Sequence, residues 1–268
     1  MNRIDARFKK LAEQAQAAFI PFFTAGDPDS DTTVRILRGA EDAGADMIEL
    51  GFPFSDPIAD GPTIQASYTR VLERGQRLAD VFDIVRTARD TCELPIVGMV
   101  SYSIVFRVGF DEFIDRALEA GLDGATIPDL PVEEAEGYFA RAHRRDFRLV
   151  CFVTPATTPE RCAMVVKHAQ GFIYYISVRG ITGERTTLPA DLVDHIRELK
   201  SLTSVPVAVG FGVSTPEQAR DVAHAADGVI VGSAIVKRMK DAADGGRDAA
   251  QAALDFIRRM ASAARSAT

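Results

Sequence analysis

The chain has 268 residues, of which 38 are acidic and 31 basic, and its formal net charge is −7. With 47% hydrophobic and 26% charged residues, it has the composition of a globular protein and is too apolar for a disordered one. The negative charge argues against a nucleic-acid-binding surface, but not against a small anion held by backbone N–H groups. The length suits one α/β barrel of about 250 residues, so residues 1–268 are expected to form one domain.

Three features of the sequence indicate the cellular compartment of the protein. Residues 1–16 have a helical pattern without an apolar signal core. No stretch approaches the roughly 20 apolar residues of a membrane span. The cysteines Cys92, Cys151 and Cys162 form no C-x-x-C pair, which is typical of a reducing compartment. We therefore expect a cytoplasmic protein that binds neither nucleic acid nor a membrane.

The apolar pattern alternates between two kinds of segment. Short runs rich in β-forming residues occur at 19–23, 47–50, 96–100, 124–127, 148–153, 172–177, 205–209 and 228–231. Amphipathic helical stretches lie between them at 32–43, 113–120, 133–144, 160–169, 190–200 and 216–225. Strict alternation predicts parallel strands with right-handed crossovers, and eight such units favour a closed (β/α)8 TIM barrel. The alternative, an open doubly wound sheet, would normally carry a G-x-G-x-x-G turn, which residues 24–28 do not fit.

Further segments depart from the regular repeat. An extra N-terminal helix at 4–17 is expected to plug the barrel bottom, and an Ala-rich helix at 247–264 to pack outside. The second β/α unit is elaborated by a loop and two helices, at 51–61, 63–73 and 79–91. A second long loop, at 179–189, follows the sixth strand. Because chemistry in such barrels occurs on loops at the carboxyl ends of strands, both loops are candidates for binding substrate.

A glutamate at a strand end is the first candidate for chemistry. Glu49 lies inside a buried run, where a carboxylate is costly unless it is hydrogen-bonded or catalytic. Burial would raise its pKa, which suits a group that both gives and takes a proton near neutrality. The alternative, a Glu paired with a polar group of a neighbouring strand, stays open at this point.

Aspartates follow two of the strands. Asp56 and Asp60 lie directly after the strand of Glu49, in a loop shaped by prolines and glycines. Such aspartates often serve turns, but the nearby buried Glu favours a role in the site for at least one of them. Asp129, after the fourth strand, could line the barrel mouth or cap a helix beginning near residue 131. Asp27 is expected to serve only its turn.

Glycines after the seventh and eighth strands could hold a phosphate. Such barrels frequently bind phosphate with these two loops and a helix N-terminus, because glycine lets backbone amides approach the oxygens. The candidates are Gly210, Gly212, Gly232 and Ser233, with Gly180 and Gly183 from the sixth loop. The alternative for each glycine is an ordinary helix-entry turn.

The sequence lacks the residues for two other chemistries. Its four histidines lie in helical stretches without metal-ligand spacing, so no metal site is expected. No lysine ends a strand, so a Schiff-base aldolase lacks its nucleophile. Several apolar side chains could wall a pocket at the mouth or simply pack the barrel: Phe22, Val100, Tyr102, Phe152, Tyr174 and Phe211.

Five stretches closely resemble the tryptophan synthase alpha chain family. They are 19–28, 48–65, 128–134, 180–183 and 210–213, and they follow the family's order across essentially the whole chain. The second stretch, which contains Glu49 and Asp60, is a long and specific signature. The resemblance implies a lyase of tryptophan biosynthesis that cleaves indole-3-glycerol phosphate, by a retro-aldol reaction, to indole and glyceraldehyde 3-phosphate.

The resemblance also implies a role for each matching residue. Glu49 would be the general acid and base, and Asp60 would accept a hydrogen bond from the indole N–H. Tyr174 would help to orient the site, and Thr182, on the sixth loop, would close over substrate and reach Asp60. The phosphate would bind Gly183, Gly212, Gly232 and Ser233, and the indole would be walled by Phe22, Val100 and Phe211.

A partner is implied as well. The family works as an α2β2 complex with a beta chain that carries pyridoxal phosphate and receives indole through a tunnel. The resemblance therefore implies no cofactor in this chain, with Pro53 and Asp56 at the interface. Two alternatives are a free-standing lyase and a non-catalytic barrel that only activates a beta chain. A phosphosugar isomerase or epimerase would leave the signature loop unexplained.

The chain departs from the commoner family pattern at three places. Val178 follows the serine of the sixth strand, residues 154–157 lack a Pro-Pro-Asn run, and Thr126 stands where a leucine is often found. These departures bear on lid closure and on the lining of the pocket rather than on the reaction.

Overall fold

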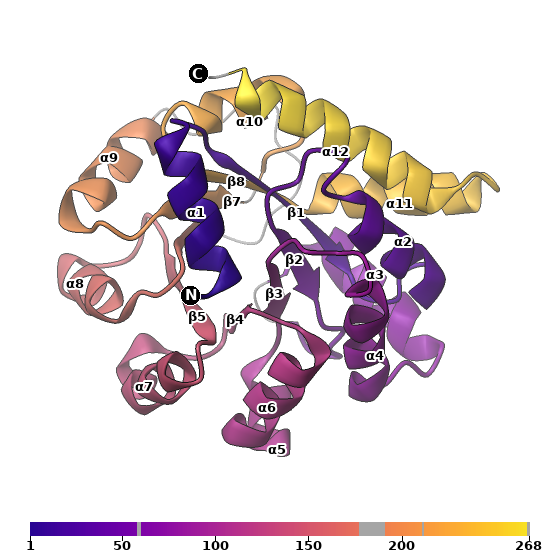
Figure 1. Cartoon of the computed structure of the whole chain (residues 1–268), viewed down its shortest axis with the longest axis horizontal. Coiled ribbons are helices and arrows are strands. Elements are labelled where there is room, and N and C mark those ends of the chain that lie inside the picture. The colour runs from indigo at the N-terminus through magenta and orange to yellow at the C-terminus, as the bar shows by residue number, and fades with distance from the viewer. Residues whose placement is uncertain (58–59, 177–190, 211, 267–268) are drawn as a thin grey trace.

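The computed structural model describes residues 1–57, 60–176, 191–210 and 212–266. Its centre is a closed barrel of parallel strands in sequential order, which the pairing of the first strand with the last completes (Figure 1). The strands are β1 (Ala18–Thr24), β2 (Ile48–Gly51), β3 (Ile96–Met99), β4 (Gly124–Thr126), β5 (Arg148–Val153), β6 (Ile173–Ile176), β7 (Val207–Gly210) and β8 (Gly228–Val231). The predicted TIM barrel is therefore confirmed.

Helices lie against the barrel, and most of them cover the outer faces of its strands (Figure 1). In chain order they are α1 (Arg3–Glu13), α2 (Ser30–Gly39), α3 (Pro62–Glu73), α4 (Leu78–Ala88), α5 (Tyr102–Val108), α6 (Phe110–Ala120), the 3-10 turn η1 (Val132–Glu134), α7 (Glu136–Arg144), α8 (Pro159–His168), α9 (Leu192–Leu202), α10 (Pro216–Ala223), α11 (Ser233–Asp244) and α12 (Ala249–Arg265). The predicted elaboration of the second unit is confirmed, because α3 and α4 both lie between β2 and β3.

Two helical segments differ from the prediction. The pattern predicts no helix where the structure has α5, because seven residues are too few to show a helical period. Gly109, at a φ of 94°, separates this short helix from α6. The single helix predicted at 133–144 is instead the turn η1 followed by α7, with Ala135 between them.

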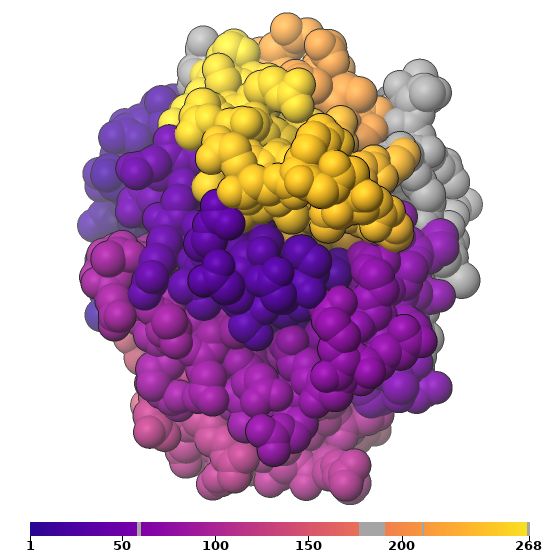
Figure 2. Space-filling view, turned by 90° about the vertical axis from the view of Figure 1, so that its right-hand side faces the viewer, coloured from indigo at the N-terminus to yellow at the C-terminus, as the bar shows by residue number. Residues whose placement is uncertain are grey.

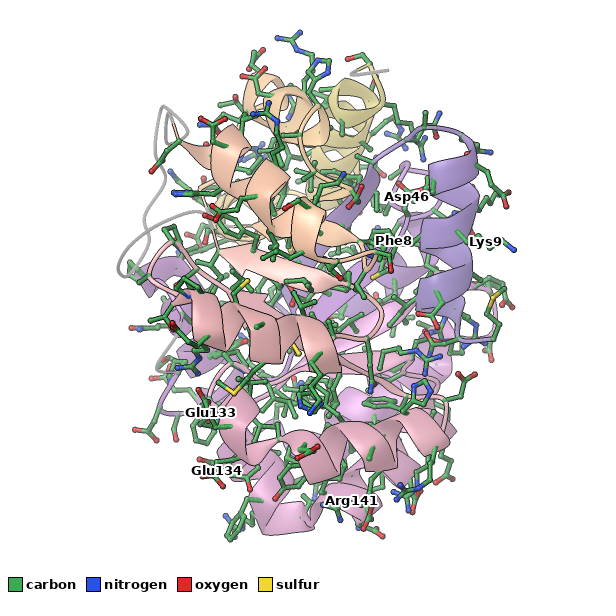
Figure 3. All side chains as sticks on the ribbon, turned by 90° about the vertical axis from the view of Figure 1, so that its left-hand side faces the viewer. Phe8, Lys9, Asp46, Glu133, Glu134 and Arg141 are labelled. Carbon is green, nitrogen blue, oxygen red and sulfur yellow. The ribbon has the colours of Figure 1, made fainter. Side chains whose placement is uncertain are left out.

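The N-terminal helix α1 closes the bottom of the barrel, as predicted. Ile4, Phe8 and Leu11 of this helix pack in one cluster with side chains from the barrel interior. Figure 3 shows Phe8 directed toward the barrel and Lys9 away from it. The ring of Phe8 lies 5.7 Å from that of Phe172, measured between centroids. This end of the barrel is thus filled by apolar packing, which leaves the other end for a site.

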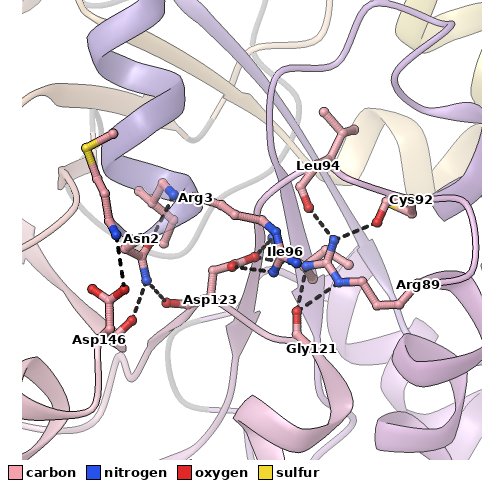
Figure 4. Close-up of polar contacts among 11 residues, drawn as sticks. Asn2, Arg3, Arg89, Cys92, Leu94, Ile96, Gly121, Asp123 and Asp146 are labelled. Atoms are coloured by element: carbon pink, nitrogen blue, oxygen red, sulfur yellow. Dashed lines mark hydrogen bonds and ion pairs between the residues drawn. The ribbon is translucent and has the colours of Figure 1, made fainter.

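A repeated aspartate holds the strands together at the same end. Asp46, Asp123 and Asp227 each stand just before an even-numbered strand and accept the backbone N–H of the preceding odd-numbered strand at 2.9 Å. Asp123 also accepts hydrogen bonds from Arg3 and Arg89, as Figure 4 shows. These bonds stabilise the register of neighbouring strands beneath the site.

The C-terminal helix α12 packs outside the barrel, as predicted. It contacts α2, α10 and α11, and Figure 2 shows it in yellow above the indigo residues of the N-terminal part. Among the residues that the structure describes, no helix combines the length and the apolar character needed to span a bilayer.

Candidate active site

A pocket opens at the carboxyl ends of the strands, at the end opposite to α1. Its empty space, including solvent at the open mouth, is about 620 Å³. Seven predicted residues line it: Phe22, Glu49, Asp60, Tyr174, Gly212, Gly232 and Ser233. The structure therefore brings together side chains from β1, β2, β6 and the loops after β2, β7 and β8.

The remaining predicted residues lie elsewhere. Val100 lines an adjoining pocket that shares Met99 and Asp60 with the first. Pro53 and Asp56 lie on the loop after β2, where the Asp56 side chain is exposed. Four predicted residues fall outside the described part of the chain: Gly180, Thr182, Gly183 and Phe211.

Glu49 is almost completely buried at the centre of this pocket. It is 1% exposed, and its backbone pairs with Phe22 of β1 and Val97 of β3. Its Oε1 accepts a hydrogen bond of 3.0 Å from the hydroxyl of Thr126, whereas its buried Oε2 has no hydrogen-bond partner among the described residues. Burial raises the pKa of Glu49 to about 8, the hydrogen bond from Thr126 opposes that rise, and the charge of Asp60 adds to it. Glu49 thus has the polar neighbour of one alternative, and its Oε2, without a partner in the described part of the chain, also leaves a role in proton transfer open.

Asp60 lies beside Glu49 but has a lower pKa. It is 8% exposed, and it precedes α3, whose first turn begins at Pro62. Burial, and then the charge of Asp129, raise the pKa of Asp60 to about 6. At neutral pH the pocket therefore holds one neutral carboxylic acid and one carboxylate, which is the arrangement that separate acid and charge-stabilising roles require.

Two buried tyrosines lie near this carboxyl pair. Burial, together with the charges of Asp60 and Glu49, holds the pKa of both Tyr68 and Tyr174 well above its usual value, so both phenols stay protonated. Tyr68 was not predicted. The sequence indicates its burial only through its spacing from Ile64. The two residues are four positions apart and lie on the buried face of α3.

Glycines leave room for the aromatic rings of the pocket. A Cβ at Gly51 would lie 2.6 Å from the ring of Phe22, and a Cβ at Gly210 would lie 2.4 Å from the hydroxyl of Tyr174. Gly210, a candidate for the phosphate whose alternative was a turn, makes space for Tyr174.

The N-terminus of α11 faces the same pocket. Gly232 is its N-cap and forms no side-chain capping bond, while Gly232, Ser233 and Ala234 all line the pocket. Gly212, at a φ of 84°, lies close by with open space around it. The first N–H groups of a helix carry partial positive charge, so this end can bind an anion such as a phosphate.

Asp129 lies beside the pocket and contacts the start of α5. Its Oδ1 accepts the backbone N–H of Tyr102 at 2.6 Å, and its Oδ2 accepts the hydroxyl of Ser101 at 2.7 Å. These bonds hold the start of α5, whose N-cap is Ser101, whereas η1 and α7 have no side-chain cap. Of the two alternatives that the sequence left open, lining the mouth fits, because Asp129 also lines the pocket beside Asp60.

Asp27 does more than serve its turn, which corrects the prediction. Its buried carboxylate accepts hydrogen bonds of 2.7 Å from Ser67 and 2.6 Å from Arg70. Both partners lie on α3, so Asp27 ties the loop after β1 to the helix that follows Asp60.

Within the described ranges, no three His, Cys, Asp or Glu side chains gather into a possible metal-binding group. The polar groups that do gather are carboxyl groups, phenols and helix amides, and these suit acid–base chemistry on an anionic substrate.

The barrel and its buried carboxyl groups define the class of protein, a TIM-barrel enzyme. The particular family follows from comparison with known sequences. The chain belongs to the tryptophan synthase alpha chain family, whose model matches residues 8–265. As a member of that family, it is a lyase of tryptophan biosynthesis.

Individual relatives agree over nearly the full length. The tryptophan synthase alpha chain of Rhodopirellula baltica is 45% identical over 271 residues, covering 97% of this chain and 98% of the relative. The solved structure of tryptophan synthase subunit alpha from Legionella pneumophila str. Paris is 36% identical, with a TM-score of 0.92 and 99% of each chain covered. A chain of the tryptophan synthase a2b2 complex from Pyrococcus furiosus is 38% identical with a TM-score of 0.83, covering 91% of this chain and 97% of that one.

Proposed function

We propose that this chain cleaves indole-3-glycerol phosphate to indole and glyceraldehyde 3-phosphate, as the alpha subunit of a tryptophan synthase. The observation that carries the proposal is the pair Glu49 and Asp60. Both line one pocket, and their pKa values are about 8 and about 6. The cleavage needs a neutral acid beside a fixed negative charge, and this pair supplies both near neutral pH.

The reaction begins with protonation of the indole ring. Neutral Glu49 donates its proton to the ring carbon that bears the glycerol side chain, and the ring becomes a positively charged indoleninium. The carboxylate of Asp60 accepts a hydrogen bond from the ring N–H and stabilises that charge. Because both carboxyl groups are buried, this stabilisation is stronger than it would be in solution.

Cleavage then returns the proton to Glu49. Its carboxylate removes the proton of the side-chain hydroxyl on the carbon attached to the ring. The O–H electrons form the aldehyde C=O, and the electron pair of the breaking C–C bond neutralises the indoleninium. Indole and glyceraldehyde 3-phosphate result, and Glu49 is neutral again, so this chain needs no cofactor for the step.

The other pocket residues hold the substrate. Amides at the start of α11 and in the loop after β7 bind the phosphate, with the hydroxyl of Ser233 as a further donor. Phe22 packs against the indole, and Tyr174 orients it. The proposal assigns Gly183 to the phosphate, Thr182 to closure over the substrate, and Phe211 and Val100 to the indole wall.

A beta chain that holds pyridoxal phosphate is the proposed partner. The docking face combines the loop of Pro53 and Asp56 with α5. A groove lined by Pro53, Phe54, Ile104 and other residues runs between them. Phe106 of α5 is 73% exposed, which is unusual for a phenylalanine and fits a surface that a partner covers.

The experiment is an assay of indole formation from indole-3-glycerol phosphate, with and without a beta chain. We expect indole from the chain alone and more when the beta chain is added. Strong activity that the partner leaves unchanged would favour the free-standing lyase. No indole in either case, together with activation of the beta chain, would favour the non-catalytic barrel.

A further inference from the structure

Thr126 is the polar neighbour of Glu49. The sequence around Thr126 does not indicate this contact. It is the last residue of β4, it is fully buried, and its hydroxyl donates to Oε1 of Glu49 over 3.0 Å. The two residues are 77 positions apart in the chain and two strands apart in the barrel.

The strand register shows why these two side chains meet. Val97 of β3 pairs with both Glu49 and Gly124. Because barrel strands are tilted, residues paired in this way are not level along the barrel axis. Thr126, two residues after Gly124 and two strands from Glu49, lies in the same layer of inward-facing side chains as Glu49. The hydroxyl therefore meets the carboxyl group inside the barrel, and the bond holds that group at the pocket.

The two oxygens of Glu49 are not equivalent. Oε1 accepts the hydrogen bond, and Oε2 is buried without a hydrogen-bond partner among the described residues. On the basis of the function proposed above, we propose that Thr126 is a positioning residue. By holding Oε1, it confines the proton that Glu49 exchanges with substrate to Oε2.

The hydrogen bond can persist through the whole reaction. When Glu49 is neutral with its proton on Oε2, Oε1 is a carbonyl oxygen and accepts from Thr126. When Glu49 is ionised, Oε1 still accepts, and the bond is stronger because the acceptor is charged. A proton on Oε1 would require the hydroxyl to turn and lose its role as donor. Because threonine is β-branched, its χ1 angle is restricted, which fixes the position of the hydroxyl oxygen.

The competing explanation is that Thr126 only fills space in the barrel. Valine has nearly the same shape but no hydroxyl, so Thr126→Val separates the two explanations. Thr24 provides a matched control. It ends β1, is fully buried, and its hydroxyl has no hydrogen-bond partner among the described residues.

Loss of the hydroxyl should change the acid–base behaviour of Glu49 in a defined direction. The bond favours the ionised form, so its removal raises the pKa of Glu49. The titratable groups that act on Glu49 within the described chain are Asp60, Tyr68 and Tyr174. All three are retained in the variant, so a shift can be assigned to the lost bond.

The first measurement is the pH dependence of indole formation by the full chain with its beta chain. For Thr126→Val we expect kcat about tenfold lower, KM within about twofold, and an upper pKa about one unit higher, which corresponds to a tenfold change in equilibrium. Thr126→Ser should restore the profile, and Thr24→Val should keep it. If Thr126→Val folds poorly, Thr126→Ser and Thr126→Cys replace it as the test pair. Serine and cysteine are similar in size, but the thiol is the weaker hydrogen-bond donor. Only Thr126→Cys should therefore raise the upper pKa.

The second measurement does not depend on turnover. The carboxyl carbon of Glu49 is followed by 13C NMR against pH in glutamate-labelled protein, and Glu49→Gln identifies its signal. If the wild type forms no indole, the proposed function fails, but a higher pKa of Glu49 in Thr126→Val would still support the positioning contact. If the wild type is active and Thr126→Val has the rate, profile and NMR titration of Thr24→Val, the proposal for Thr126 is wrong.

Discussion

Glu49 and Asp60 line one pocket, yet their pKa values lie on opposite sides of neutrality, at about 8 and about 6. Burial is the main cause in both cases. The charge of Asp60 raises the pKa of Glu49 further, whereas Glu49 is already neutral in the range where Asp60 titrates. A narrow range of pH therefore holds the acid and the counter-charge in their working forms.

The first prediction is a bell-shaped dependence of kcat/KM on pH. Below about pH 6 Asp60 becomes protonated and can no longer stabilise the ring cation, so the rate falls. Above about pH 8 Glu49 loses the proton that it must donate, so the rate falls again. Indole formation measured from pH 5 to pH 9.5 tests this. A rate that keeps rising above pH 8 would contradict the role of Glu49 as the initial acid.

The second prediction concerns Asp60. Asp60→Asn keeps the shape of the side chain but removes the charge, so we expect kcat to fall by about 10²–10³-fold with little change in KM. Loss of that charge should also lower the pKa of Glu49 in a 13C NMR titration. A variant with at least half of the wild-type kcat would show that Asp60 does not stabilise the cation.

The third prediction tests the anion site at α11. Ser233→Asp places a negative charge where the substrate phosphate is proposed to bind, so KM should rise more than about tenfold. The same charge interacts favourably with the helix N-terminus and should leave the protein as stable as before or slightly more so. Ser233→Ala, which removes only a hydroxyl donor, should raise KM by only about threefold. An unchanged KM for Ser233→Asp would place the phosphate elsewhere.

The fourth prediction concerns the opposite end of the barrel. Asp123 accepts the N–H of Ile96 and pairs with Arg89, whose side chain is only 13% exposed. Asp123→Ala leaves that guanidinium without its carboxylate partner, so we expect a loss of about 3 kcal/mol in the free energy of unfolding. Asp255→Ala, which breaks an exposed pair with Arg258, should cost less than about 1 kcal/mol. Equal urea midpoints for the two variants would contradict this account.

Most of the barrel could be predicted from the sequence because its signals are local. Short apolar runs, proline after a capping threonine and glycine at a helix end each act within a few residues. Thr158 and Thr215 cap α8 and α10, whose first residue is a proline in each case, and Gly121 ends α6 in the left-handed conformation. The short helix α5 was missed because seven residues show no clear period.

The site could be predicted only in part, because its contacts join residues that are far apart in the sequence. The sequence shows that a residue ends a strand, but it does not show which side chain that residue contacts across the barrel. Thr126 was noted as a departure in the pocket lining, and only the structure shows its hydroxyl on Glu49. Asp27 looked local but bonds to Ser67 and Arg70, about 40 residues away, across two elements.

The most direct test of the central claim is indole formation from indole-3-glycerol phosphate by Glu49→Gln in complex with a beta chain. Glutamine keeps the size of the side chain but can neither donate nor take the proton. The account predicts that kcat falls by at least about 10³-fold, within the range for loss of a general acid–base group, while the fold and the binding of inorganic phosphate persist. A variant that releases indole at a rate near that of the wild type would contradict the account.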